Sequence, residues 1–153
     1  MKRLILIPAL FGLFMLNVAS MCSSDDNSSS LSNPTPVIDI VTQGTWRITS
    51  YVDSGTNETN NFTGYNFTFD PSNEIIAENG TNTYLGTSWS IVTDNSNDDN
   101  TTDLDFIIIF PSPIDFEELT DDWEIVSYTA TTISLIDVSG GNGGTDTLVF
   151  TKN

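Results

Sequence analysis

Short runs of alternating apolar and polar residues, divided by clusters of Asn, Asp, Gly and Ser, fill the chain from about residue 44 onward. Successive side chains of a β-strand point to opposite faces of its sheet, so this alternation indicates strands with one buried face. In 63–70 (TGYNFTFD), for example, Tyr65, Phe67 and Phe69 alternate with polar residues. The pattern predicts an all-β domain.

We expect eight strands, one for each such run. They are expected at 44–52, 63–70, 73–79, 83–92, 104–110, 122–128, 132–137 and 146–152. The run LDFIIIF is apolar at nearly every position, which predicts a strand covered on both faces. One helical turn is expected where Asp115 precedes Glu118 by three residues. Antiparallel strands of this number and length form a small closed barrel or a sandwich, and the pattern leaves both open.

The first residues follow a different pattern. Lys2 and Arg3 precede an unbroken apolar run of 13 residues, 4–16 (LILIPALFGLFML), after which small and polar residues follow. A basic segment, an apolar segment and a zone of small residues, in that order, are typical of an export signal peptide. As a helix the run would be only about 20 Å long, whereas the hydrocarbon core of a bilayer is about 30 Å thick. The run is therefore predicted to direct export and not to anchor the chain.

Cys22, the only cysteine of the chain, ends the stretch 19–22 (ASMC). This stretch resembles the lipobox of bacterial lipoproteins, although Met21 departs from the small residue usual before the cysteine. The resemblance implies that Cys22 is acylated, becomes the first residue of the mature protein and holds it in the outer membrane. The following SSDD resembles the surface-export signal of Bacteroidota lipoproteins, which implies display at the cell surface. A cleaved soluble protein with an unpaired thiol is the alternative.

The sequence thus divides into three parts. Residues 1–21 are the predicted lipoprotein signal peptide. Residues 22–41 hold the acylated cysteine and a Ser-, Asn- and Pro-rich stretch without hydrophobic periodicity, which is interpreted as a flexible tether. Residues 42–153 contain the predicted strands and form the β domain.

A second resemblance concerns this domain. Gly44-x-Trp46 on its first strand resembles the G-x-W motif of lipocalins and of the small calycin-type domains of bacterial surface lipoproteins. In these domains a late W-E-V/I strand, here 123–125, precedes a hairpin and a last strand that ends in a basic residue, here Lys152. The resemblance covers 42–153 and implies an eight-stranded lipocalin-like barrel. It implies a tight turn at Gly44, a plug of the barrel end by Trp46, and a cation–π contact of Lys152 over the indole.

The chain is strongly acidic, with 21 Asp and Glu against four Lys and Arg and a net charge of −17. Such a surface repels nucleic acid, because proteins that bind it neutralise phosphates with Lys and Arg. It also repels anionic lipid, so attachment to the membrane is expected through the acyl chains. The chain has no histidine and a single cysteine, which excludes the usual zinc sites and His-dependent catalytic triads. We expect no nucleic-acid partner, no cofactor and no metal.

Two acidic segments carry candidate chemistry. Residues 94–105 (DNSNDDNTTDLD) resemble an EF-hand loop, but Asp99 occupies the position that requires glycine. We interpret the segment as a solvated hairpin loop, and weak calcium binding stays open. The acidic residues of 115–122 lie beside Trp123, and paired carboxylates are what a glycosidase needs, but the sequence places no two of them in one cleft. No catalytic residue and no enzymatic activity are expected.

The aromatic residues are the remaining candidates for a site. The possible lining of a cavity inside the barrel consists of Tyr65, Phe67, Phe69, Trp89, Phe106 and Trp123. Lipocalins bind small apolar molecules in this place, but side chains of this kind also fill small barrels completely. The preferred hypothesis is a lipid-anchored surface lipoprotein that binds a small apolar ligand without catalysis. The alternatives are a structural or interaction module of an outer-membrane complex, and a glycan-binding surface with aromatics such as Tyr84 or Tyr128.

Overall fold

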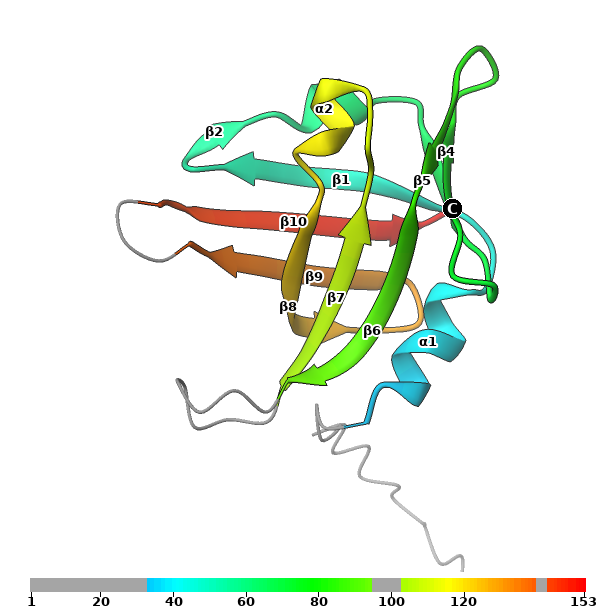
Figure 1. The fold of residues 1–153 in the computed structure, drawn as a ribbon, viewed down its shortest axis with the longest axis vertical. Coiled ribbons are helices and arrows are strands. Elements are labelled where there is room, and N and C mark those ends of the chain that lie inside the picture. The colour runs from blue at the N-terminus through cyan, green and yellow to red at the C-terminus, as the bar shows by residue number, and fades with distance from the viewer. Residues whose placement is uncertain (1–32, 95–102, 140–142) are drawn as a thin grey trace, which may run out of the picture.

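The computed structural model describes residues 33–94, 103–139 and 143–153, and these form an all-β fold, as predicted (Figure 1). One antiparallel sheet contains ten strands of the described residues. The elements in chain order are α1 (Thr35–Val41), β1 (Trp46–Asp53), β2 (Thr56–Asn57), the 3-10 helix η1 (Thr59–Phe62), β3 (Asn66–Phe69), β4 (Ile75–Glu78), β5 (Thr83–Gly86), β6 (Ser88–Asp94), β7 (Asp103–Ile109), α2 (Ile114–Glu117), β8 (Asp121–Tyr128), β9 (Thr132–Val138) and β10 (Thr145–Lys152).

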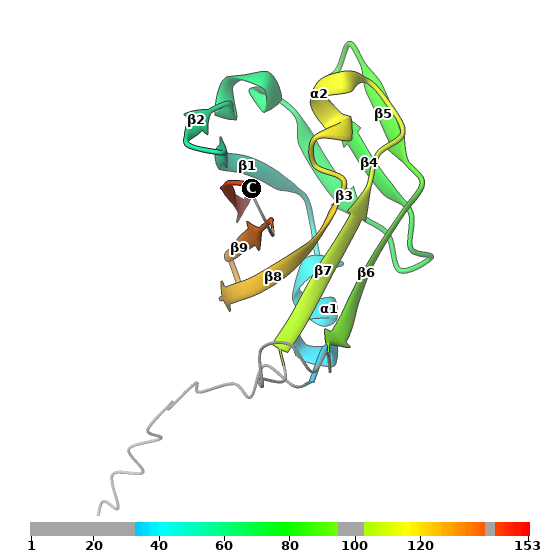
Figure 2. The same cartoon turned by 60° about the vertical axis from the view of Figure 1, so that its left-hand side comes forward.

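The sheet is strongly curved. Its strand order is β5-β4-β3-β1-β10-β9-β8-β7-β6, with β2 paired to β1 beside this path. In Figure 1, β1, β10 and β9 run across the view, and β8, β7 and β6 run up it in front of them. Figure 2 shows the sheet curving around an interior, with α1 at one end of the molecule and α2 at the other.

The expected eight-stranded closed barrel is not supported, because the sheet has ten strands and two edges, β5 and β6. The run 83–92, expected as one strand, divides into these two. Single hydrogen bonds, instead of a ladder, join β6 to the turn between β3 and β4. The Trp89 backbone N–H donates to the Asn73 carbonyl at 3.0 Å, and the Asn73 side-chain amide donates to the Trp89 carbonyl at 3.0 Å.

The division of this run has a local cause at Gly86 and Thr87. A Cβ at Gly86 would run into the Ile75 side chain and would lie 2.7 Å from the Ile109 carbonyl oxygen, so only glycine allows the chain to cross so closely. The next residue already pairs with β7, since the Thr87 N–H donates to the Ile109 carbonyl at 2.8 Å. The chain therefore changes from a neighbour of β4 to a neighbour of β7 within two residues.

The interior is filled mainly by aromatic rings. Phe69 contacts Trp89, Phe106 and Phe150 with ring centroids 5.6, 5.2 and 5.5 Å apart. Most of the ring pairs meet edge to face, the arrangement that the ring quadrupole favours. All four of these side chains are buried. The alternation in the sequence therefore places its apolar positions in one continuous core.

Helix α1 lies within the segment that was expected to be a flexible tether. Val37 and Val41 are four residues apart on one face of the helix, and both are fully buried in the core. The Val41 carbonyl also accepts a hydrogen bond from the Trp46 indole at 2.8 Å. Seven residues are too few for a helix to be stable alone or to show a clear period, so packing on the sheet is what stabilises it.

The three residues of the lipocalin-like motif meet at the start of β1. Gly44 has a φ of +77°, and a Cβ there would lie 3.3 Å from Lys152 Cε. Trp46 is fully buried, and Lys152 Nζ lies 5.3 Å from the centroid of its ring. This spacing is within the range of a cation–π contact. No helix in the described part of the chain is long and apolar enough to cross a bilayer.

Candidate binding site

The two edges of β1 are paired very differently. Along one edge β1 pairs with β10 from Trp46 to Val52, with one irregularity after Ile48. Along the other edge the pairing in the described residues is limited to the two ends of the strand. Trp46 pairs with Phe67 of β3 at one end, and Val52 pairs with Asn57 of β2 at the other. The middle of β1 therefore has no strand beside it on this edge.

The segment between β2 and β3 bridges this interruption without pairing to the middle of β1. It is held at its start by Thr59, whose hydroxyl accepts from the Tyr51 N–H at 2.8 Å and donates to the Tyr51 carbonyl at 3.3 Å. The Glu58 N–H donates to the same carbonyl at 3.0 Å. Phe62 of η1 is then buried against Tyr51, with ring centroids 5.4 Å apart. The chain returns to β1 only at β3.

A cleft of about 430 Å³ lies between β1 and this segment. Its lining consists of Arg47, Ile48, Thr49, Thr59, Phe62, Thr63, Gly64, Tyr65, Asn66 and Asn153. The apolar members Ile48 and Phe62 are only 6% and 1% exposed and belong to the core, whereas the charged and amide members are exposed. The volume is in the range of about 300–1,000 Å³ that is usual for small-molecule sites.

Hydrogen bonds connect the polar side chains of the cleft. Arg47 Nη1 donates to Asn153 Oδ1 at 3.3 Å. The Asn153 amide nitrogen donates to Asn66 Oδ1 at 2.8 Å and to Thr45 Oγ1 at 3.0 Å. Asn153 therefore links β1 to β3 and positions the guanidinium and an amide beside each other.

Arg47 is the single arginine of the described residues, because the other arginine of the chain is Arg3. In the described residues its hydrogen-bond partner is the neutral amide of Asn153, and no carboxylate forms an ion pair with it. A guanidinium has five N–H donors, so most of them face solvent. The cleft thus presents a positive charge with donors that a ligand can use.

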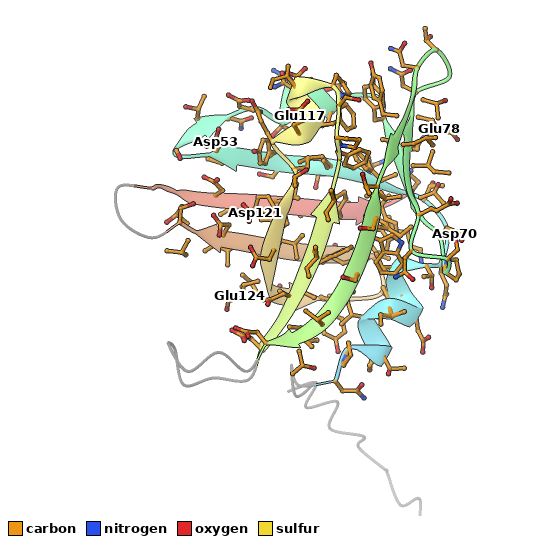
Figure 3. All side chains as sticks on the ribbon, viewed as in Figure 1. Asp53, Asp70, Glu78, Glu117, Asp121 and Glu124 are labelled. Carbon is orange, nitrogen blue, oxygen red and sulfur yellow. The ribbon has the colours of Figure 1, made fainter. Side chains whose placement is uncertain are left out.

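The acidic side chains lie elsewhere and are widely spread. Figure 3 shows Glu78 on β4, Glu117 on α2, and Asp121 and Glu124 on β8. The described residues that line the cleft include no carboxylate side chain, histidine or cysteine. Within ranges 33–94, 103–139 and 143–153 there is also no group of three or more such residues placed to hold a metal. The cleft offers hydrogen bonds and one charge, but no general acid or base.

Several carboxylates lie near one another on β7 and β8. Asp105 stands opposite Glu124 in the antiparallel pair. Burial, followed by the charges of Asp94, Asp103, Asp122 and Glu124, raises the pKa of Asp105 to about 6. A similar cause acts at the start of β8, where burial raises the pKa of Asp121 to about 6. The acidic segment 115–122 lies on α2 and the start of β8. Its Phe116 packs against Phe62 and Tyr65 of the cleft, but none of its carboxylate residues is in the lining.

The predicted ligand-lining aromatics are placed in the core. Tyr65, Phe67, Phe69, Trp89, Phe106 and Trp123 are all at most 9% exposed. Of these six, Tyr65 alone is in the lining of the cleft. The proposed glycan platforms are also partly covered, because Tyr84 stacks on Tyr65 at 5.6 Å and Tyr128 packs against the core. Cys22 and residues 95–102 of the calcium candidate 94–105 lie outside the described residues.

Sequence reasoning did not single out Arg47, Thr49, Asn66 or Asn153. A signal for Arg47 is present, since it is one of only two basic residues after position 3 of the chain. It also occupies a polar position between two apolar residues of a predicted strand, which places it on the outer face. Nothing in the pattern shows that Asn66 and Asn153 meet it there.

Comparison with known proteins gives little further information. No family model matches the chain, and no curated protein matches it. A solved structure of a DUF4847 family protein from Bacteroides vulgatus is similar, with 16% identity and a TM-score of 0.44. The similarity covers 76% of this chain and 97% of that protein. We draw nothing about the site from a likeness at this level.

Proposed function

We propose that the chain is a lipid-anchored, surface-displayed lipoprotein whose β domain binds a hydroxyl-rich ligand, such as an oligosaccharide, in the cleft beside β1. The observation that carries this proposal is the composition of the cleft. Guanidinium, amide and hydroxyl groups form most of its exposed lining. Sugars carry many hydroxyl groups, which both donate and accept hydrogen bonds and so can pair with each of these groups.

The packing of the interior favours this ligand over an apolar one bound inside the sheet. An apolar molecule at the predicted aromatic residues would have to separate rings that contact one another. The ring centroids of Phe69 and Phe106 are 5.2 Å apart, and those of Phe67 and Phe150 are 5.4 Å apart. Interiors of proteins are close-packed, and moving such side chains apart costs stability.

The lining also favours binding over catalysis. Hydrolysis of a glycosidic bond by the usual route requires two carboxyl groups that flank the bond. The described residues of the cleft contribute no carboxylate side chain. A ligand held there would be recognised by Arg47, Asn66 and Asn153 without being cleaved.

The anchor belongs to the same proposal and rests on the sequence around Cys22. Two or more acyl chains on this cysteine would hold the protein stably, whereas one chain alone binds only marginally. Metabolic labelling with a fatty-acid analogue is expected to tag the wild-type chain and Ser23→Ala, but not Cys22→Ala. Equal labelling of Cys22→Ala would contradict the anchor.

Binding in the cleft is tested with a variant whose larger side chain occupies the cleft. The full chain in mild detergent is applied to an oligosaccharide array, and binding is compared with that of Thr49→Trp, which places an indole in the cleft at an exposed position. We expect the variant to lose the signal. Val126→Trp on β8 is the matched control, because Val126 is 53% exposed and is not part of the lining, and it should bind normally.

Two results would contradict this assignment. Wild-type protein that binds no oligosaccharide, or Thr49→Trp that binds as well as Val126→Trp, would remove the cleft as the site. Co-purification of an outer-membrane protein with a chain that binds no sugar would instead support the alternative of an interaction module.

A further inference from the structure

The cleft has a property that goes beyond affinity for hydroxyl groups. We infer that its ligand is an acidic oligosaccharide, in which the carboxylate of a uronic acid pairs with Arg47. This inference rests on the proposed function and deepens it by naming the class of sugar. It is carried by the position of the only guanidinium of the described residues in the lining of the cleft.

The partner of Arg47 is unusual for so acidic a chain. With 21 carboxylate residues and four basic ones, an exposed arginine has many opportunities for an ion pair. Arg47 instead donates to the Asn153 amide oxygen at 3.3 Å, and no carboxylate of the described residues pairs with it. The charge is therefore available to a ligand.

The geometry of a guanidinium selects the ligand group. Its planar arrangement of N–H donors matches a carboxylate through two parallel hydrogen bonds, and such charge-assisted pairs are stronger than neutral ones. The hydrogen bond to Asn153 limits how Arg47 can orient. A carboxylate can use the donors that remain.

The neighbours of Arg47 indicate that this carboxylate is carried by a sugar. The Asn153 side-chain amide donates a hydrogen bond to Asn66 Oδ1 at 2.8 Å. Thr49 and Thr63 are exposed in the same lining. Amides and hydroxyls both donate and accept, which suits a ring with several hydroxyl groups next to its acid group. A simple carboxylate such as acetate would leave these groups unused.

The overall charge makes the contribution of Arg47 more selective. A net charge of −17 repels anionic ligands in general. At physiological salt, charges further away than about 8 Å are largely screened, so the local charge determines binding in the cleft. Without Arg47 the same cleft would accept neutral sugars and disfavour acidic ones.

The test uses a matched pair of ligands, an oligogalacturonate and the same oligosaccharide after chemical reduction of its carboxyl groups. Calorimetry on the full chain in mild detergent should show about 10- to 100-fold tighter binding of the acidic form, as expected for hydrogen bonds to a charged group. Arg47→Gln should lose this preference and bind the acidic and the reduced form about equally, because the charge that distinguishes them is removed. Arg47→Lys should retain part of the preference.

Lys152→Gln is the control with the same change in net charge. Lys152 lies over the Trp46 ring and is not in the lining, so this variant should keep the preference for the acidic form. Circular dichroism establishes that each variant is folded, and Arg47 is exposed, which favours folding of its variants.

The outcomes separate this inference from the proposed function. Equal binding of both sugars by the wild type would overturn the inference and leave the proposed function in place, whereas binding of neither would overturn the proposed function. The same loss of preference in Lys152→Gln would assign it to net charge and not to Arg47. Acetate that binds as tightly as the oligogalacturonate would overturn the assignment to a sugar.

Discussion

The two edges of β1 belong to the same strand but have very different surroundings. One edge is paired with β10 from Trp46 to Val52. The other is paired only at its ends and borders a cleft of about 430 Å³. The comparison shows that an interruption in strand pairing is enough to create a cleft, because the unpaired stretch of the strand then borders a loop that lies apart from it instead of a hydrogen-bonded strand.

The largest effect on stability is expected at Trp46, where β1 is paired along both edges. Trp46→Ala removes a fully buried side chain and its hydrogen bond to the Val41 carbonyl, and should lower the free energy of unfolding by about 3–5 kcal/mol. Urea unfolding measures this value. Thr49→Ala, at an exposed position of the same strand, should change it by less than about 0.5 kcal/mol. A similar loss of unfolding free energy in both variants would mean that Trp46 is not a main source of stability in β1.

A smaller effect is expected at Thr59, which holds the bridging segment to β1. Thr59→Val keeps the size of the side chain but removes the hydroxyl that accepts from and donates to the backbone of Tyr51. The partly buried Tyr51 N–H loses its partner, so unfolding should become easier by about 1–3 kcal/mol. Thr59→Ser keeps the hydroxyl and serves as the control. If calorimetry of oligosaccharide binding is unchanged in Thr59→Val, this contact does not shape the cleft.

The smallest effect concerns pH and the paired part of the sheet. The pKa of Asp105 is raised to about 6 by burial and by neighbouring carboxylates, whereas an unfolded Asp has a pKa near 3.9. The folded state therefore binds more protons between these values, and the protein should be more stable at pH 5 than at pH 7.5, with the gain lost as pH rises through about 6.

Asp105→Asn tests this assignment by thermal unfolding at the two pH values. At pH 7.5 the variant should be more stable than the wild type by about 1 kcal/mol or less, because solvent screens a partly exposed group. Its stability should also depend less on pH. Sugar binding should not follow this titration, since Asp105 is not in the lining and no carboxylate side chain among the described residues lines the cleft. If Asp105→Asn is less stable than the wild type at pH 7.5, burial and neighbouring carboxylates do not destabilise the charged form of Asp105.

Much of the β architecture was predictable from local pattern. The alternation around Phe67 and Phe69 and the apolar run 104–110 correspond to β3 and β7, because side-chain period reports directly on burial. The division of 83–92 at Gly86 was not predictable in this way. It depends on how closely the chain passes Ile75 and Ile109, residues that are distant in sequence.

The candidate site was less predictable than the fold. Aromatic residues such as Trp89 and Phe106 were expected near a ligand because they are large and apolar, and the structure buries both in the core. Arg47 could have been noticed as a rare basic residue. Its meeting with Asn66 and Asn153 could not, since these residues are brought together by the pairing of β1 with β3 and by hydrogen bonds of the last residue.

The amino-acid sequence specified an all-β domain, an apolar core and an acidic surface, because alternation, residue type and charge are properties that each short segment carries alone. Tertiary structure decided that the sheet has two edges instead of closing, that 35–41 folds as a helix on the core, and that a polar cleft opens beside β1. The physical reason is that these three features depend on contacts between residues far apart in the chain, and no local pattern encodes where a strand loses its partner.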